Sequence, residues 1–270
     1  YIIGDYMFIC PVCKNELNKT GKSLICSNGH CFDMAKSGYV NLLLKSTGGN
    51  HGDNKLMVSA RRDFLDKGYY EPLREAIVKM CREFTASGDI IVDCGCGEGY
   101  YTSKIAEVLP DRTVCGFDIS KDALAVAAKR NKTVEYAVAS SFDIPLPDSC
   151  ADMITEIFSP HSEKEFLRIL KPDGRMLMVI PLENHLLELK QAVYDKAYKN
   201  EPSSFEIEGF KLLKSERVEY TADIACTEDI KNLFAMTPYY YKTGEKEQAR
   251  LNTLQRLSVT LSFEVLCYGL

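Results

Sequence analysis

The sequence Ile90-Ile91-Val92-Asp93-Cys94-Gly95-Cys96-Gly97-Glu98-Gly99-Tyr100-Tyr101 decides the fold. A short apolar run ends in an acid, a glycine-rich loop follows, and a helical pattern begins after it, which predicts a β-strand, a tight turn and a helix N-terminus. The spacing is G-x-G-x-G, whereas dinucleotide-binding turns have G-x-G-x-x-G and bind a pyrophosphate at the helix N-terminus. Asp93 and Glu98 would repel a pyrophosphate, so we expect a ligand that carries positive charge.

S-adenosylmethionine (SAM) meets this requirement because it has a sulfonium and an ammonium group. The stretch resembles motif I of the class I SAM-dependent methyltransferases, although a glycine motif alone is a weak signal and could be a structural turn. The resemblance predicts an α/β fold with a Rossmann-like sheet of seven strands, the last antiparallel. Asp118 ends the predicted second strand, residues 113–118, where an acid can accept hydrogen bonds from both ribose hydroxyls.

The composition is that of an ordinary globular protein, with 46% hydrophobic and 26% charged residues among 270. The sequence has no run of 18 apolar residues and no visible signal peptide, and Met7 is a candidate native start. The eleven cysteines do not form a disulfide framework, which predicts reduced thiols and a cytoplasmic location. The net charge of −5 argues against a whole-surface nucleic-acid binder. Residues 1–74 nevertheless hold ten Lys/Arg and seven Asp/Glu, so a polyanion would favour this part.

A second motif precedes the glycine loop. Cys10-Pro11-Val12-Cys13 is followed after twelve residues by Cys26-Ser27-Asn28-Gly29-His30, and residues 15–22 between them are expected to form a hairpin tip. Two ligand pairs at this spacing predict a closed tetrahedral zinc site, which would stabilise a segment too small for a core of its own. Cys31 is the alternative fourth ligand, but we favour His30 because Gly29 gives the knuckle backbone freedom.

The combination of motifs is more specific than either alone. The zinc pattern runs into CFDMAKSGYVNLL (31–43), then ARRDFLDKGYYEPL (60–73), then VDCGCGEGYYT (92–102). Together they closely resemble the bacterial 23S rRNA (guanine-N1)-methyltransferases of the RlmA type, over nearly the whole chain from Met7. Tyr241 departs from the family, which usually has tryptophan there. The resemblance implies SAM-dependent methylation of guanine N1 in a hairpin loop of domain II of 23S rRNA, with structural Zn²⁺.

The resemblance also predicts site residues at the strand ends. Tyr70, before a helix over 72–84, and His185, before a helical stretch, would contact SAM; the alternatives are an aromatic packing residue and a helix N-terminal residue. Phe158 would stack on the target guanine, with core packing as the alternative. A carboxylate could serve as the general base; Glu156 and Asp143 are the nearest by sequence position, but the resemblance supports neither and neither is chosen. The predicted SAM-binding residues are Tyr70, Asp93, Gly95, Gly97, Glu98, Asp118, Ser140, Ser141 and His185.

We expect three segments: a zinc-binding RNA-recognition module (7–45), a polar linker (46–58) that separates it from the rest, and a methyltransferase domain (59–270). A homodimer is a candidate oligomeric state, and no membrane contact is expected. Two alternative functions are a small-molecule methyltransferase and a non-catalytic protein that binds zinc and SAM. The cations expected to contact RNA phosphates are Lys14, Lys19, Lys22, Lys36, Arg61 and Arg62.

Overall fold

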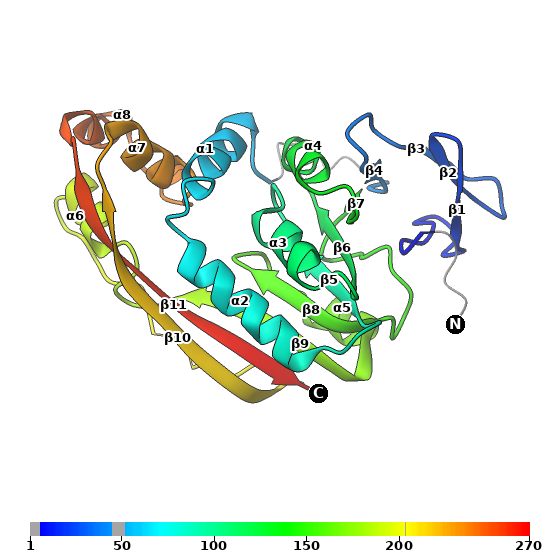
Figure 1. Ribbon diagram of the computed structural model, residues 1–270. Coiled ribbons are helices and arrows are strands. Elements are labelled where there is room, and N and C mark those ends of the chain that lie inside the picture. The colour runs from blue at the N-terminus through cyan, green and yellow to red at the C-terminus, as the bar shows by residue number, and fades with distance from the viewer. Residues whose placement is uncertain (1–5, 45–51, 203) are drawn as a thin grey trace.

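The computed structural model describes residues 6–44, 52–202 and 204–270, and within these ranges an eight-stranded sheet forms the centre of the molecule (Figure 1). Its strand order is β10-β11-β9-β8-β5-β6-β7-β4. The strands are β4 (Val40–Asn41), β5 (Ile90–Cys94), β6 (Thr113–Asp118), β7 (Glu135–Val138), β8 (Ala151–Ile157), β9 (Leu170–Pro181), β10 (Lys211–Ile224) and β11 (Leu257–Gly269).

The sheet is parallel from β4 to β9, and the last strand, β11, is antiparallel to both β9 and β10. The central strand β5 pairs with β6 on one side and with β8 on the other. The chain therefore reverses its direction of progress across the sheet beside β5. In open α/β sheets, ligands bind beyond the carboxyl ends of the strands at this reversal.

Helices cover both faces of the sheet. Figure 1 shows α2, α3 and α4 in front of the sheet and α5 behind it, while α1, α7 and α8 lie in a row along the top of the view. α1 packs on α7, far from it in sequence. The helices are α1 (Lys55–Leu65), α2 (Glu71–Phe84), α3 (Tyr100–Val108), α4 (Lys121–Arg130), α5 (Glu163–Ile169), α6 (Leu187–Val193), α7 (Thr227–Ala235) and α8 (Glu245–Gln248).

The N-terminal module is a small antiparallel sheet of β1 (Leu17–Thr20), β2 (Ser23–Cys26) and β3 (Cys31–Asp33). The chain then supplies β4, which pairs in parallel with β7 and becomes an edge strand of the main sheet. Phe8 and Leu24 of the module are fully buried in the same hydrophobic cluster as Phe117 of β6. The module and the rest of the chain thus share both a sheet and a core.

The predicted fold class is confirmed, but the predicted count of seven strands is wrong because β4 comes from the N-terminal module. The predicted hairpin tip, residues 15–22, was too long: β1 occupies four of these eight residues, and the chain turns at Gly21, which has a φ of +65°. Residues 45–51, including His51 and most of the predicted linker, lie outside the described residues. The predicted linker ends at residue 58, inside α1. Helix α5 was not predicted, and α8 is followed directly by a 3₁₀ segment, Ala249–Thr253.

Candidate functional site

The glycine loop between β5 and α3 is held in left-handed backbone conformations. Gly95, Gly97 and Gly99 have φ values of +79°, +55° and +80°. A Cβ atom on Gly95 would lie 2.4 Å from Cβ of Ser159, in the loop after β8, and one on Gly99 would lie 2.9 Å from Cβ of Ala127 in α4. Only glycine fits these two positions, because the loop is pressed against both neighbours.

Asp118 lies at the carboxyl end of β6, as predicted, beside this loop. Its Oδ2 accepts a hydrogen bond from the Gly97 N–H (3.0 Å), and its Oδ1 accepts one from the Ser120 N–H (2.7 Å). Burial raises the pKa of this carboxyl, and the two N–H groups oppose that shift. The backbone therefore fixes a half-buried acid at the carboxyl end of β6, where a ribose diol could be bound.

Asp93 is placed differently, beneath the loop. Its side chain is 2% exposed, and its carboxylate accepts hydrogen bonds from Thr155 Oγ1 of β8 (2.8 Å) and from Thr102 Oγ1 of α3. Burial raises its pKa to about 6, although both threonines lower it. In this arrangement Asp93 joins three elements below the loop.

Glu98 is also buried, at 3% exposure, but its Oε1 has no hydrogen-bond partner among the described residues. Arg130 Nη2 lies 3.7 Å away, and burial raises the pKa of Glu98 against the opposing charges of Arg61 and Arg130. A buried acceptor without a donor requires an explanation. A ligand with an ammonium group beside the glycine loop would supply that donor.

Arg61 closes over this region instead of pointing outward. It forms an ion pair with Asp53 and donates to the Met236 carbonyl (3.3 Å) after α7. A Cβ atom on Gly97 would lie 3.7 Å from Arg61 Nη1. The Asp53 carbonyl accepts a hydrogen bond from Ser120 Oγ (2.6 Å), so the segment before α1 reaches the acid at the end of β6. Asp53 was not predicted, because its contacts are 8 to 67 residues away in sequence.

Three predicted residues meet at one aromatic side chain. Phe263 of β11 has ring centroids of Tyr70, Phe158 and His185 at 5.3, 5.6 and 4.5 Å. Tyr70 is buried, whereas Phe158 is 48% exposed and has a φ of +57°. A left-handed non-glycine residue with an exposed aromatic ring is unusual and marks the loop after β8 as a functional candidate. Phe263 was missed because nothing local in β11 distinguishes it from a core residue.

His185 is a neutral histidine. Its Nδ1 accepts a hydrogen bond from the Ser262 N–H (3.3 Å), which leaves Nε2 as the protonated nitrogen. Burial and then the charge of Lys190 lower its pKa to about 3. Its ring can therefore donate one hydrogen bond but cannot carry a positive charge near neutral pH.

Ser140 and Ser141 follow β7 at the same sheet edge, and both are half-buried. Ser140 Oγ accepts a hydrogen bond from the Phe142 N–H (3.2 Å). Asp143, one of the two carboxylates considered as a base, forms an exposed ion pair with Lys14 of the N-terminal module (3.1 Å). The other, Glu156, is paired with His161.

The predicted zinc ligands are brought together. The ligand atoms of Cys10, Cys13, Cys26 and His30 all lie within 4.8 Å of one another. The sulfurs of Cys10 and Cys26 are 3.5 and 3.3 Å from His30 Nδ1, and the Cys13 and Cys26 sulfurs are 3.6 Å apart. Zinc–ligand bonds of ordinary length would give tetrahedral edges of about 3.5–3.8 Å. The cluster therefore fits Zn²⁺, and Cys31 is exposed outside it.

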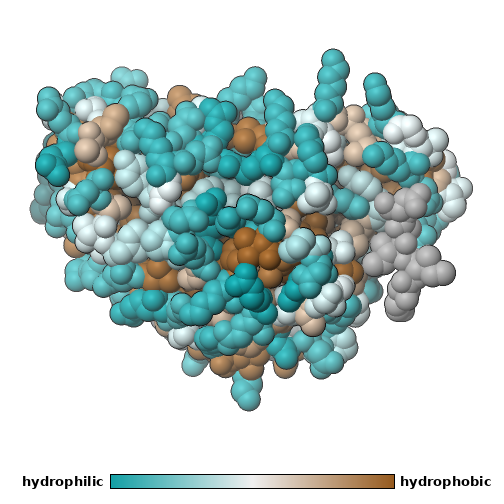
Figure 2. Space-filling view, in the orientation of Figure 1, coloured by the Kyte–Doolittle hydropathy of each residue, from teal (hydrophilic) through white to brown (hydrophobic). Residues whose placement is uncertain are grey.

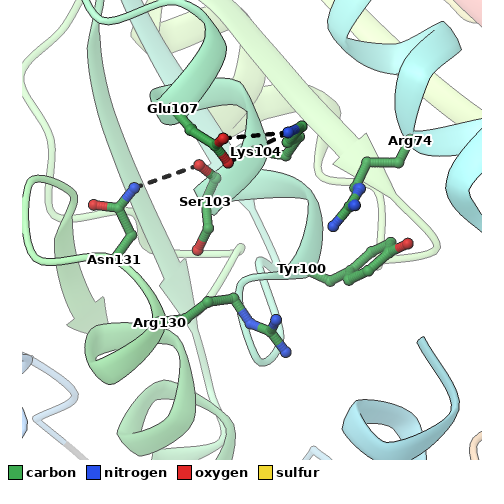
Figure 3. Close-up of a pocket in the computed structure, with 7 residues that line it drawn as sticks. All are labelled: Arg74, Tyr100, Ser103, Lys104, Glu107, Arg130 and Asn131. Carbon is green, nitrogen blue, oxygen red and sulfur yellow. Dashed lines mark hydrogen bonds and ion pairs between the residues drawn. The ribbon is translucent and has the colours of Figure 1, made fainter. Parts of the chain in front are cut away.

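A hollow of about 340 Å³ lies elsewhere, on the outer face of α2, α3 and α4 (Figure 3). Tyr100 lies between Arg74 and Arg130 in this view, and the Arg74 guanidinium carbon is 4.2 Å from the Tyr100 ring centroid. Arg74, Lys104 and Arg130 are each paired with an acid. None of the predicted SAM-binding residues lines this hollow, and we assign no ligand to it.

One face of the molecule is mainly polar (Figure 2). Figure 2 shows hydrophilic side chains over most of this face, with a small hydrophobic patch near its centre. Within the described residues, no helix has both the length and the apolar character needed to span a bilayer.

Comparisons with known proteins match both parts of the chain. Residues 8–44 match the family described as "RlmA, N-terminal", and residues 85–246 match a family described as "Methyltransferase domain". A 23S rRNA (guanine(748)-N(1))-methyltransferase of Streptomyces fradiae is 38% identical over 187 residues, which are 68% of this chain and 66% of that protein. YxjB of Bacillus subtilis, named as a candidate 23S rRNA (guanine-N(1)-)-methyltransferase, is 30% identical over 96% of both chains. Among solved structures, YjhP of E. coli is similar in fold, with a TM-score of 0.52 at 16% identity over 80% of this chain and 99% of that one.

Proposed function

Because the chain belongs to the RlmA-type 23S rRNA (guanine-N1)-methyltransferases, we propose that it transfers a methyl group from SAM to N1 of a guanine in 23S rRNA. The observation that carries this proposal is that a Cys₃His cluster and an acid-flanked glycine loop occur in one continuous core. A small-molecule methyltransferase would need the loop but not the zinc module. The hairpin loop of domain II is the target that we propose within the rRNA.

The strand-end residues divide the cofactor among them in this proposal. When bound, SAM supplies a methyl group activated by the sulfonium charge. Asp118 would accept hydrogen bonds from the ribose hydroxyls, and Ser140 and Ser141 would face the adenine. Glu98 would accept from the ammonium group through its unpartnered Oε1. Tyr70 and His185 would close the site through their packing on Phe263, and Asp93 would hold the loop in place from below.

The target guanine would be held by Phe158, whose exposed ring can stack on a base taken out of an RNA loop. Most of the rate enhancement would then come from holding N1 in line with the methyl group. Residues 7–45 would serve as an RNA-recognition module held by Zn²⁺ on Cys10, Cys13, Cys26 and His30. Its exposed lysines would contact phosphates: Lys14, Lys19, Lys22 and Lys36.

The test is methylation of 23S rRNA that lacks the modification, with radiolabelled SAM. Methylation of N1 blocks Watson–Crick pairing, so primer extension should stop next to one guanine. The isolated hairpin and full-length 23S rRNA are compared to locate the target. Label recovered only in small molecules would support a small-molecule methyltransferase. SAM binding without transfer to any acceptor would support a non-catalytic protein that binds zinc and SAM. Sedimentation of the protein with and without rRNA tests the homodimer that we include in the proposal.

A further inference from the structure

A buried carboxylate and a histidine form a pair at the exit of β8. Glu156, the second-last residue of β8, is 5% exposed, and its Oε2 lies 2.7 Å from Nδ1 of His161. The His161 ring packs edge-on against Phe166 of α5, with centroids 5.2 Å apart. Two contacts therefore fix the orientation of the imidazole before any substrate is present.

The other ring nitrogen of His161 is not used. Nε2 is buried and has no hydrogen-bond partner among the described residues. Buried polar atoms in native proteins nearly always have a partner, and exceptions concentrate at catalytic groups and at sites that bind water or ligands. Because Nδ1 faces a carboxylate, it carries the proton, and Nε2 of the neutral ring is a free acceptor.

The loop that carries His161 lies against the glycine loop. Ser159 Oγ donates a hydrogen bond to the Cys94 carbonyl (2.5 Å), and Ser159 Cβ occupies the space that a side chain on Gly95 would need. The same loop presents the exposed Phe158 ring. His161 is thus three residues from the aromatic side chain proposed to stack on the guanine and two residues from a contact with the cofactor loop.

Methylation at guanine N1 requires a proton acceptor, because neutral guanine carries a proton on N1. Three nearby carboxylates are already engaged: Asp93 with two threonines, Asp118 with two backbone N–H groups, and Asp143 with Lys14. A fourth, Glu98, has an unpartnered Oε1, but the proposed function assigns that oxygen to the ammonium group of SAM. His185 is a poor base, since its pKa is lowered to about 3. Among these groups, His161 alone combines an unused acceptor nitrogen with a carboxylate that would stabilise its protonated form.

Resting on the proposed function, we propose that His161, oriented by Glu156, accepts the N1 proton of the target guanine at Nε2. The N1–H bond breaks and the proton moves to Nε2. The electron pair on N1 forms the new bond to the methyl carbon as the bond between that carbon and sulfur breaks, and its electron pair stays on sulfur. The products are N1-methylguanine, the neutral thioether and an imidazolium paired with Glu156. Because Nε2 is buried, the loop over 158–161 must shift to let the target guanine reach it, as catalytic loops commonly do.

The electrostatic surroundings suit this role. The hydrogen bond to Glu156 raises the pKa of His161, burial opposes it, and the charges of Glu156 and Glu163 raise it further. Cys94 and Tyr268 are the titratable groups that face Glu156 from β5 and β11. A general base is most effective when its pKa lies near the working pH.

The experiment uses His161→Asn in the full-length protein. Asparagine keeps a donor to Glu156 near the Nδ1 position but removes Nε2. We expect SAM affinity measured by calorimetry to be unchanged and the single-turnover rate of rRNA methylation to fall by about 10²- to 10⁴-fold. The wild-type rate should level off above the pKa of His161. The variant rate should continue to rise with pH, because the guanine must then ionise without help.

A second measurement needs neither SAM nor RNA. The pKa of His161, measured by NMR, should fall in Glu156→Gln and change much less in Glu163→Gln, which removes a charge but no hydrogen bond. A His161→Asn rate within threefold of wild type, with the same pH profile, would mean that the pair only positions the loop. That result would overturn the role of His161 as proton acceptor and leave the proposed function intact. An unchanged His161 pKa in Glu156→Gln would also overturn it. Failure of the wild type to methylate any guanine would overturn the proposed function and this inference with it.

Discussion

Replacing Asp93 by asparagine should separate the buried charge of this residue from its hydrogen bonds. The asparagine side chain has the same shape and can still pair with Thr102 and Thr155, because its oxygen accepts and its nitrogen donates. Only the charge is lost. We expect SAM affinity to be nearly unchanged in Asp93→Asn, because the carboxylate lies beneath the loop, and to fall at least tenfold in Asp118→Asn, whose charged oxygens lie at the sheet edge.

The stability effect follows from the pKa of Asp93, which is raised from 3.8 to about 6 in the folded protein. A group with a raised folded-state pKa binds its proton more tightly in the native state. Its stabilising contribution is present below pH 3.8 and is lost as the pH rises to about 6. At about 1.4 kcal/mol per pKa unit, the full contribution is ~3 kcal/mol, of which about 1.4 kcal/mol falls between pH 5 and pH 8.

The assay is urea unfolding of wild type and Asp93→Asn at pH 5 and pH 8. The free energy of unfolding of Asp93→Asn minus that of the wild type should be about 1.4 kcal/mol larger at pH 8 than at pH 5. Taking this difference cancels the pH dependence of the zinc site and of the other buried acids. An equal difference at the two pH values would refute the buried charge, and a large loss of SAM affinity in Asp93→Asn would show that the charge acts on the cofactor.

Three further predictions concern the N-terminal module. Metal analysis should find about one zinc equivalent in the wild type and in Cys31→Ala but not in His30→Ala, and the reverse result for the two variants would make Cys31 the fourth ligand. Phe8→Ala should lower the free energy of unfolding by about 3–5 kcal/mol, because its ring is fully buried in the core shared with the main sheet; a loss below about 1 kcal/mol would mean that the module is loosely attached. Each of the four exposed lysines of the module is replaced by glutamine, one at a time. Each lost phosphate contact should reduce the slope of the logarithm of the rRNA binding constant against the logarithm of the salt concentration by about 0.7–0.9, with unchanged SAM affinity. The effect should be smallest for Lys14, which is already paired with Asp143, and equal binding at all salt concentrations would exclude these lysines as contacts.

Local sequence determined the elements of the site. The alternating glycines near β5 permit the left-handed backbone that the loop adopts, and the acids at the ends of β5 and β6 follow from where the apolar runs stop. The zinc cluster could also be predicted, because each ligand pair is set by a short turn and four ligands must converge on one ion. These features depend on contacts between residues close in sequence or on chemistry that demands a fixed spacing.

Tertiary structure alone decided how these elements are used. Asp93 and Asp118 look alike in sequence, yet one is buried by Thr102 and Thr155 and the other is held at the sheet edge by backbone N–H groups. The aromatic centre at Phe263 joins β11 to residues up to 193 positions earlier in the chain.

The role of the N-terminal module was likewise hidden in the sequence. A polar stretch after residue 45 suggested a separate unit, but β4 pairs with β7 and extends the main sheet. Strand pairing depends on which edge is left open once the other strands are in place, and no local pattern encodes that edge. The pairing of Glu156 with His161 was unpredicted for a different reason: the conformation of the turn after β8 determines which side chain meets the buried carboxylate.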